Sequence, residues 1–137
     1  MRRPVSTTLA VVVIALVVSA CSVLPWVSST PDAFTDRSEL ASCGVEDRGR
    51  GAPEPSEGEV CLVEAMTGGT AAELAATALT DEGDAIRSYY RTVPGVPGLV
   101  VYVDGTDDSY GSQGWVLLTC PDATAPSDLG DCSETSL

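Results

Sequence analysis

The chain has 137 residues, of which 20 are acidic, seven are basic and none is histidine, so its formal net charge is −13. Two of the seven arginines precede Cys21 and every acidic residue follows it, which leaves five basic and twenty acidic residues, a net charge near −15, beyond that point. Such a charge excludes nucleic acid as a partner and would repel an anionic lipid surface.

An apolar run from Leu9 to Val18 follows Arg2 and Arg3 and is closed by Val18-Ser19-Ala20-Cys21. A positive n-region before an apolar segment of this length is typical of an export signal. The four residues resemble the lipobox of bacterial lipoproteins. With its lack of lysine and its bias towards Ala, Val, Gly and Asp, the chain resembles the small, functionally uncharacterised lipoproteins of actinobacteria.

This resemblance implies that residues 1–21 are a lipoprotein signal peptide with its lipobox. It also implies that Cys21 becomes the lipidated N-terminus, carrying a diacylglycerol thioether and often a further acyl chain such as palmitate. The protein would then be anchored by lipid to the cell membrane, on the extracytoplasmic face. Sec export is the favoured route, because Pro4-Val5-Ser6 lack the apolar pair that usually follows twin arginines.

Two other interpretations of the leader stay open: a secretory signal cleaved without lipidation, and an uncleaved membrane helix. Ten to twelve helical residues would span only about 15–18 Å of a hydrocarbon core of about 30 Å. A longer helix would have to continue through Pro25, which interrupts helical hydrogen bonding. Both observations count against the uncleaved membrane helix and leave the cleaved secretory signal open.

The region beyond Cys21 is predicted to contain a flexible Ser- and Pro-rich tether at 22–35, one small domain at 36–121 and an acidic irregular tail at 122–137. In the tether, Trp26 is expected either at the lipid headgroup level or packed on the domain. About a hundred residues suffice for one domain and not for two.

The first elements of the domain are a weakly alternating strand at 39–45 and a Gly- and Pro-rich loop at 47–57. Ser56 followed by Glu59 matches a capping box, and an apolar stripe at helical spacing follows it, so a helix is predicted over 57–67, ending at Gly68-Gly69. Residues 71–80 are ambiguous, since their alanines and leucines fit a helix and a strand equally well.

Three further strands are predicted at 83–93, 99–104 and 114–120, the first two joined by the turn Pro94-Gly95-Val96-Pro97. In the favoured hairpin register, Tyr90 faces Val101 and Ser88 faces Val103 on an apolar side. The opposite side then holds Arg87 across from Asp104, Tyr89 across from Tyr102, and Arg91. A shift by one residue would mix the two sides and lose apolar burial.

The expected fold is therefore α+β: one helix packed on a small antiparallel sheet of three to five strands and stapled by disulfides. The cysteines beyond Cys21 are Cys43, Cys61, Cys120 and Cys132, an even number that indicates two disulfides outside the cytoplasm. Neighbour pairing, Cys43–Cys61 with Cys120–Cys132, is favoured because it closes short Gly- and Pro-rich loops. Joining Cys61 to Cys120 and Cys43 to Cys132 is the competing arrangement.

No catalytic motif is found: the chain has no histidine base and no G-x-S-x-G sequence, and the acidic loop after Asp104 departs from the calcium-loop pattern. Neither a metal nor another cofactor is expected. The sharpest candidate for binding is the sheet face of Arg87, Tyr89, Arg91 and Tyr102, residue types that dominate binding hot spots. Cross-strand pairing explains the same pattern without any ligand.

The favoured function is a lipid-anchored domain that is non-catalytic and binds an envelope protein or a small ligand. Two alternatives are kept. One is a small envelope hydrolase that uses paired carboxylates, and the other is a purely structural component of the envelope.

Overall fold

The computed structural model describes residues 30–51 and 55–137. The leader, Cys21 and Trp26 lie outside these residues. The described elements are two helices and six strands: α1 (Asp32–Thr35), β1 (Ala41–Gly49), α2 (Glu57–Thr67), β2 (Ala72–Leu79), β3 (Ala85–Thr92), β4 (Leu99–Asp104), β5 (Trp115–Cys120) and β6 (Ser133–Ser136).

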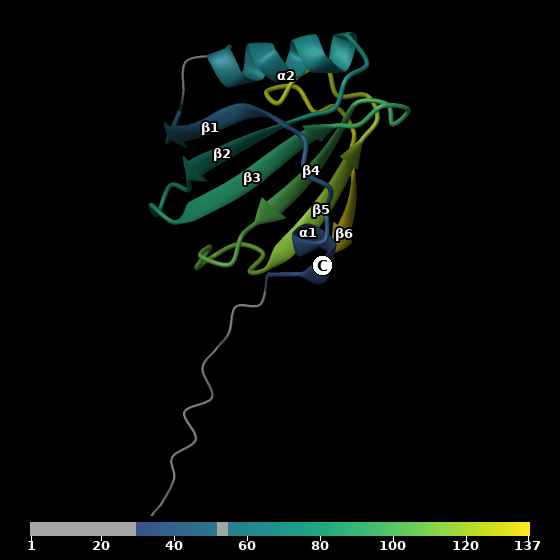
Figure 1. Cartoon of the computed structure of the whole chain (residues 1–137). Coiled ribbons are helices and arrows are strands. Elements are labelled where there is room, and N and C mark those ends of the chain that lie inside the picture. The colour runs from purple at the N-terminus through teal and green to yellow at the C-terminus, as the bar shows by residue number, and fades with distance from the viewer. Residues whose placement is uncertain (1–29, 52–54) are drawn as a thin grey trace, which may run out of the picture.

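All six strands form one twisted sheet in which they lie side by side in chain order (Figure 1). β1 and β2 are parallel, whereas every later pair is antiparallel. The predicted fold class, one helix on an antiparallel sheet of three to five strands, is therefore wrong: the protein is mostly β, and its sheet is mixed and six-stranded.

The parallel pair has a simple cause in the position of α2. A parallel connection needs a crossover, and α2 carries the chain back to the starting end of the sheet. The helix has the predicted bounds, and its N-terminus is capped by Ser56 Oγ, which accepts a hydrogen bond from Glu59 N at 3.1 Å. Gly69, at φ +66°, follows its last turn.

The ambiguous segment 71–80 is a strand. Ala72, Leu74 and Ala76 of β2 are buried, while the residues between them point to the other side of the sheet. β2 lies between β1 and β3, so both of its edges are hydrogen-bonded. This pairing on two sides outweighs the helical preference of alanine and leucine.

The predicted hairpin register is confirmed. Tyr90 pairs with Val101, Ser88 with Val103, Tyr89 with Tyr102 and Arg87 with Asp104. The turn between the strands is closed by a hydrogen bond from Val96 N to Val93 O at 3.0 Å.

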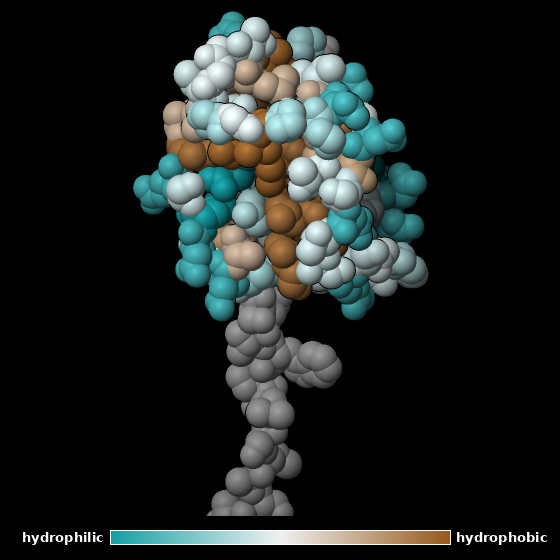
Figure 2. Space-filling view, turned by 90° about the vertical axis from the view of Figure 1, so that its right-hand side faces the viewer, coloured by the Kyte–Doolittle hydropathy of each residue, from teal (hydrophilic) through white to brown (hydrophobic). Residues whose placement is uncertain are grey.

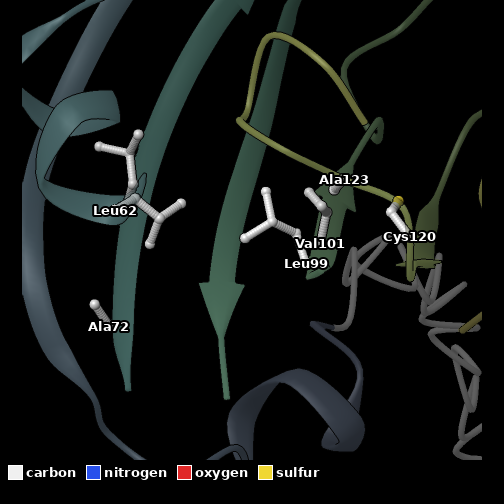
Figure 3. Packing of buried hydrophobic residues seen from close by; sticks show 7 residues of the cluster. Leu62, Ala72, Leu99, Val101, Cys120 and Ala123 are labelled. Atoms are coloured by element: carbon white, nitrogen blue, oxygen red, sulfur yellow. The ribbon is translucent and has the colours of Figure 1, made fainter. Parts of the chain in front are cut away.

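The core lies between α2 and one face of the sheet (Figure 3). Leu62 from the helix meets apolar residues from three central strands and from the segment after β5. The members of this cluster are Leu62, Ala72, Leu74, Leu99, Val101, Cys120 and Ala123. We call this side of the sheet the core face.

The tail at 122–137 was predicted to be irregular, but part of it is ordered into a strand. Ser133–Ser136 forms β6 on the edge of the sheet against β5, and Ala123 is buried in the core. β6 has no apolar residue, so no alternating pattern marks it as a strand in the sequence.

Two disulfides staple the fold, and they confirm the predicted neighbour pairing. Cys43–Cys61 joins β1 to α2, and Cys120–Cys132 joins the end of β5 to the residue before β6. The competing arrangement through Cys61–Cys120 is therefore wrong.

Candidate functional site

The four residues predicted as a binding face do share one side of the sheet. Tyr89 lies directly opposite Tyr102, and Arg87 lies opposite Asp104. Successive side chains of a strand point to opposite faces, so these residues point away from the core face. Trp115 of β5 lies on the same side of the sheet, because it pairs with Asp104 of β4.

This side is covered by the chain itself. The Phe34 ring, at the end of the predicted tether, lies 4.6 Å from that of Tyr89, 5.5 Å from that of Tyr102 and 4.5 Å from that of Trp115, centroid to centroid. The guanidinium of Arg37 stacks on Phe34 at 3.6 Å from its centroid. We call these four rings the aromatic cluster. They fill the surface on which a ligand of the predicted face would rest.

The side chain of Arg91 is buried against the protein and is not accessible to a ligand. It is only 5% exposed. Its Nε lies 3.0 Å from Glu73 Oε2, and its Nη2 donates to Ser38 O. Glu73 also accepts two hydrogen bonds from Arg37, from Nε at 3.0 Å and from Nη2 at 3.1 Å. This hydrogen bonding raises the pKa of Arg37, although burial alone would lower it. These contacts fasten the segment after α1 to β2 and β3.

Arg87 is the one of the four with a broadly open side chain, 41% exposed. It lies 2.9 Å from Asp107 and 3.4 Å from Asp104, and the hydrogen bond to Asp107 raises its pKa. Asp104 and Asp107 therefore share one guanidinium, which cancels one of their two negative charges.

Beside the α1 segment lies a polar hollow of about 280 Å³, lined by Thr35, Arg37, Ser38, Glu39, Leu40 and Glu73. Of its three charged lining residues, Arg37 and Glu73 bind each other through two hydrogen bonds, and Glu39 is exposed. Two of the three charged groups that line the hollow are therefore already paired with each other.

A second cluster of charges lies where α2 begins. Arg48 donates to Glu46 Oε2 at 3.1 and 3.2 Å and approaches Glu59 Oε2 at 3.7 Å. Burial alone would raise the pKa of Glu46, but hydrogen bonds from Ser56, Arg48 and Gly58 outweigh it and lower the pKa below its ordinary value. This carboxylate is held ionised, the opposite of what a general acid needs.

In the acidic loop between β4 and β5, Asp104 and Asp108 accept hydrogen bonds from backbone N–H groups two or three residues further along the chain. Asp104 Oδ1 accepts from Thr106 N at 3.1 Å, and Asp108 Oδ1 accepts from Tyr110 N at 3.1 Å and from Gly111 N at 2.7 Å. Across residues 30–51 and 55–137, no group of three or more His, Cys, Asp or Glu is arranged to hold a metal ion. The same ranges contain no helix long and apolar enough to cross a bilayer.

Sequence reasoning missed Phe34, Arg37, Glu73 and Trp115. Two signals were available: alternation along β5 places Trp115 on the side opposite Cys120, and Phe34 is the only phenylalanine of the chain. The close approach of Phe34 to β3 could not be read from spacing, because the chain reaches it from outside the predicted domain.

Charge and apolar character are distributed unevenly over the surface. Every arginine beyond Cys21 lies between residues 37 and 91, so the chain from 92 onward carries no basic residue. Seen from the side where β5 and β6 lie, apolar residues form a band down the middle of the domain, flanked by hydrophilic ones (Figure 2).

No protein-family model matches the chain, and no match is found among curated proteins or solved structures.

Proposed function

We propose that the protein is a membrane-anchored extracytoplasmic lipoprotein with a small, non-catalytic binding domain. The observation that carries the proposal is the distribution of the five cysteines. Four of them pair in two disulfides within the domain. The fifth is Cys21, which ends the apolar leader and is left over for lipidation.

The disulfides support the compartment as well as the anchor. Disulfides persist in oxidising environments and are rare in the cytosol of most organisms. Export through the leader would bring the chain into such an environment, and each disulfide closes a loop that contains glycine and at least two prolines. The leader and the cysteine pairing thus point independently to the outside of the membrane.

The anchor would fix the orientation of the domain. Thr30, the first described residue, is nine residues from Cys21, and a fully extended chain of that length spans roughly 30 Å. Thr30 leads directly into α1, which lies at the opposite end of the domain from α2 (Figure 1). A lipid on Cys21 would therefore keep the α1 end close to the membrane and leave the α2 end facing outward.

The charged groups support binding rather than acid–base catalysis. A hydrolase with two carboxylates needs one of them protonated near neutral pH. Glu46 and Glu59 share Arg48, and Asp104 and Asp107 share Arg87, so in each of these close pairs one cation cancels one of the two negative charges. The lowered pKa of Glu46 has the wrong direction for a general acid.

Metabolic labelling with an alkyne fatty acid tests the anchor. Wild-type protein should incorporate the label and appear in the membrane fraction, whereas Cys21→Ala should remain unlabelled and unprocessed. Ser22→Ala is the matched control and should behave as wild type. Equal labelling of wild type and Cys21→Ala would refute the proposal.

A further inference from the structure

An apolar groove of about 260 Å³ lies between α2 and the segment that follows β5. Val60 and Val63 of α2 line one side, with Pro55 near the helix start and Thr124 and Ala125 opposite. Val60 is 42% exposed, a high value for a valine beside other apolar groups. The groove is smaller than most small-molecule sites and fits one or two side chains of a partner.

The two charged residues that line this groove, Glu59 and Glu64, are both acidic. α2 contains Glu57, Glu59 and Glu64 and no basic residue, and the opposite wall belongs to the part of the chain after Arg91 that has none either. Glu64 is exposed on the rim and lines the groove. A cation placed beside the apolar lining would therefore meet an attractive potential from the α2 side of the groove.

Glu59 adds an independent observation at the floor. It lines the groove and is only 2% exposed. Its Oε1 accepts from Ser127, but its Oε2 accepts no hydrogen bond from any residue that the structure describes, and Arg48 Nη2 is 3.7 Å away. Glu46 and Glu59 share the single cation of Arg48, so this group of three charges keeps a net negative charge beside the groove.

We propose that this groove binds a segment of an exported partner protein in which aliphatic side chains are flanked by Lys or Arg. The aliphatic side chains would cover Val60 and Val63, and the flanking cations would lie near Glu64. This inference rests on the proposed function, since the α2 end of a lipid-anchored domain faces away from the membrane. A second copy of the chain does not fit, because its charge near −15 would repel the groove.

Fluorescence anisotropy with a defined peptide tests the groove. The probe is a fluorescein-labelled Gly/Ser dodecapeptide with a central Lys-Leu-Lys-Leu-Lys block, added to the lipidated chain purified in nonionic detergent. We expect saturable binding that the double variant Val60→Ser/Val63→Ser weakens about tenfold, through lost apolar burial. Glu64→Gln should weaken it about threefold and reduce its salt dependence, as for an exposed ion pair.

The controls separate the groove from general attraction to an acidic protein. Val45→Ser and Val96→Ser replace exposed valines outside the groove and should leave binding unchanged. A probe with glycine in place of both leucines should lose binding to wild type. Three outcomes would each refute the proposed binding site: wild type does not bind the probe, the two probes bind equally, or the Val60/Val63 and Glu64 variants bind as wild type does. All of these outcomes leave the lipid labelling of Cys21 unaffected, so the two proposals fail separately.

Discussion

Glu46 of β1 accepts a hydrogen bond from the backbone N–H of Gly58, 3.0 Å away in the first turn of α2. The first N–H groups of a helix have no partner within it, so this carboxylate caps α2 from the neighbouring strand. The approach is close: a Cβ on Gly58 would lie 2.5 Å from both Glu46 Oε1 and Leu74 Cδ1. Together with Cys43–Cys61, this contact sets how α2 rests on the sheet.

Gly58→Ala should therefore destabilise the domain by about 1–3 kcal/mol, because the added methyl group overpacks the contact between helix and sheet. Urea unfolding followed by circular dichroism measures the change. Gly51→Ala, at an exposed glycine with no atom within 4 Å of the added Cβ, is the control. If both variants unfold at the same urea concentration, α2 does not rest on β1 and β2 as described.

Acid should weaken the same contact. The pKa of Glu46 is lower in the folded protein than its ordinary value, so its stabilising effect is present above the ordinary pKa of about 4.3 and is lost as the pH falls through the folded value. The urea midpoint of wild type should fall between about pH 5 and pH 3, and Glu46→Gln should reduce that fall. Glu57→Gln, at an exposed position of α2, should keep it. An equal pH dependence in all three proteins would contradict the role of Glu46.

The helix and the hairpin could be predicted because their signals are local. Ser56, the apolar stripe of α2 and the alternation around Pro94-Gly95 each lie within a dozen residues. β6 could not be predicted, since its four exposed polar residues gain their strand conformation only from pairing with β5. β1 was predicted as a strand, but its parallel pairing with β2 depends on where α2 packs, which spacing does not specify.

In the candidate site, too, the local pairing could be predicted from the sequence and the long-range contact could not. The sequence correctly placed Tyr89 and Tyr102 side by side, because the hairpin register follows from keeping apolar residues on one side. It could not show that Phe34 covers them, since that contact joins residues 55 positions apart in the chain. The face was therefore interpreted as open when it is packed.

Phe34→Ala should remove the centre of the aromatic cluster. Phe34 is only partly buried, so the expected loss is about 3 kcal/mol, the lower end of the range for a core phenylalanine. Water would then reach Trp115, and its fluorescence should shift to the red. Phe34→Leu, which keeps apolar contact, should lose clearly less stability. Wild-type stability and emission in Phe34→Ala would show that the segment before β1 does not pack on the sheet.

The two disulfides should contribute comparably to stability. Their sequence separations are 18 and 12, for which the chain-entropy estimate is about 3 kcal/mol each. Replacing Cys43 and Cys61 together by alanine should lower the free energy of unfolding by this order, as should replacing Cys120 and Cys132. Non-reducing peptide mapping of wild type should yield these two linked pairs. A peptide that joins Cys61 to Cys120 would contradict the fold.

Intact mass spectrometry of the protein, purified from membranes without reductant and treated with an alkylating reagent, tests the central claim most directly. The account predicts a chain that begins at Cys21 and carries a diacylglycerol group, with four fewer hydrogens than the reduced form and no alkylated cysteine. A chain that still begins at Met1, with no lipid and with Cys43, Cys61, Cys120 and Cys132 alkylated, would contradict both the anchor and the extracytoplasmic location.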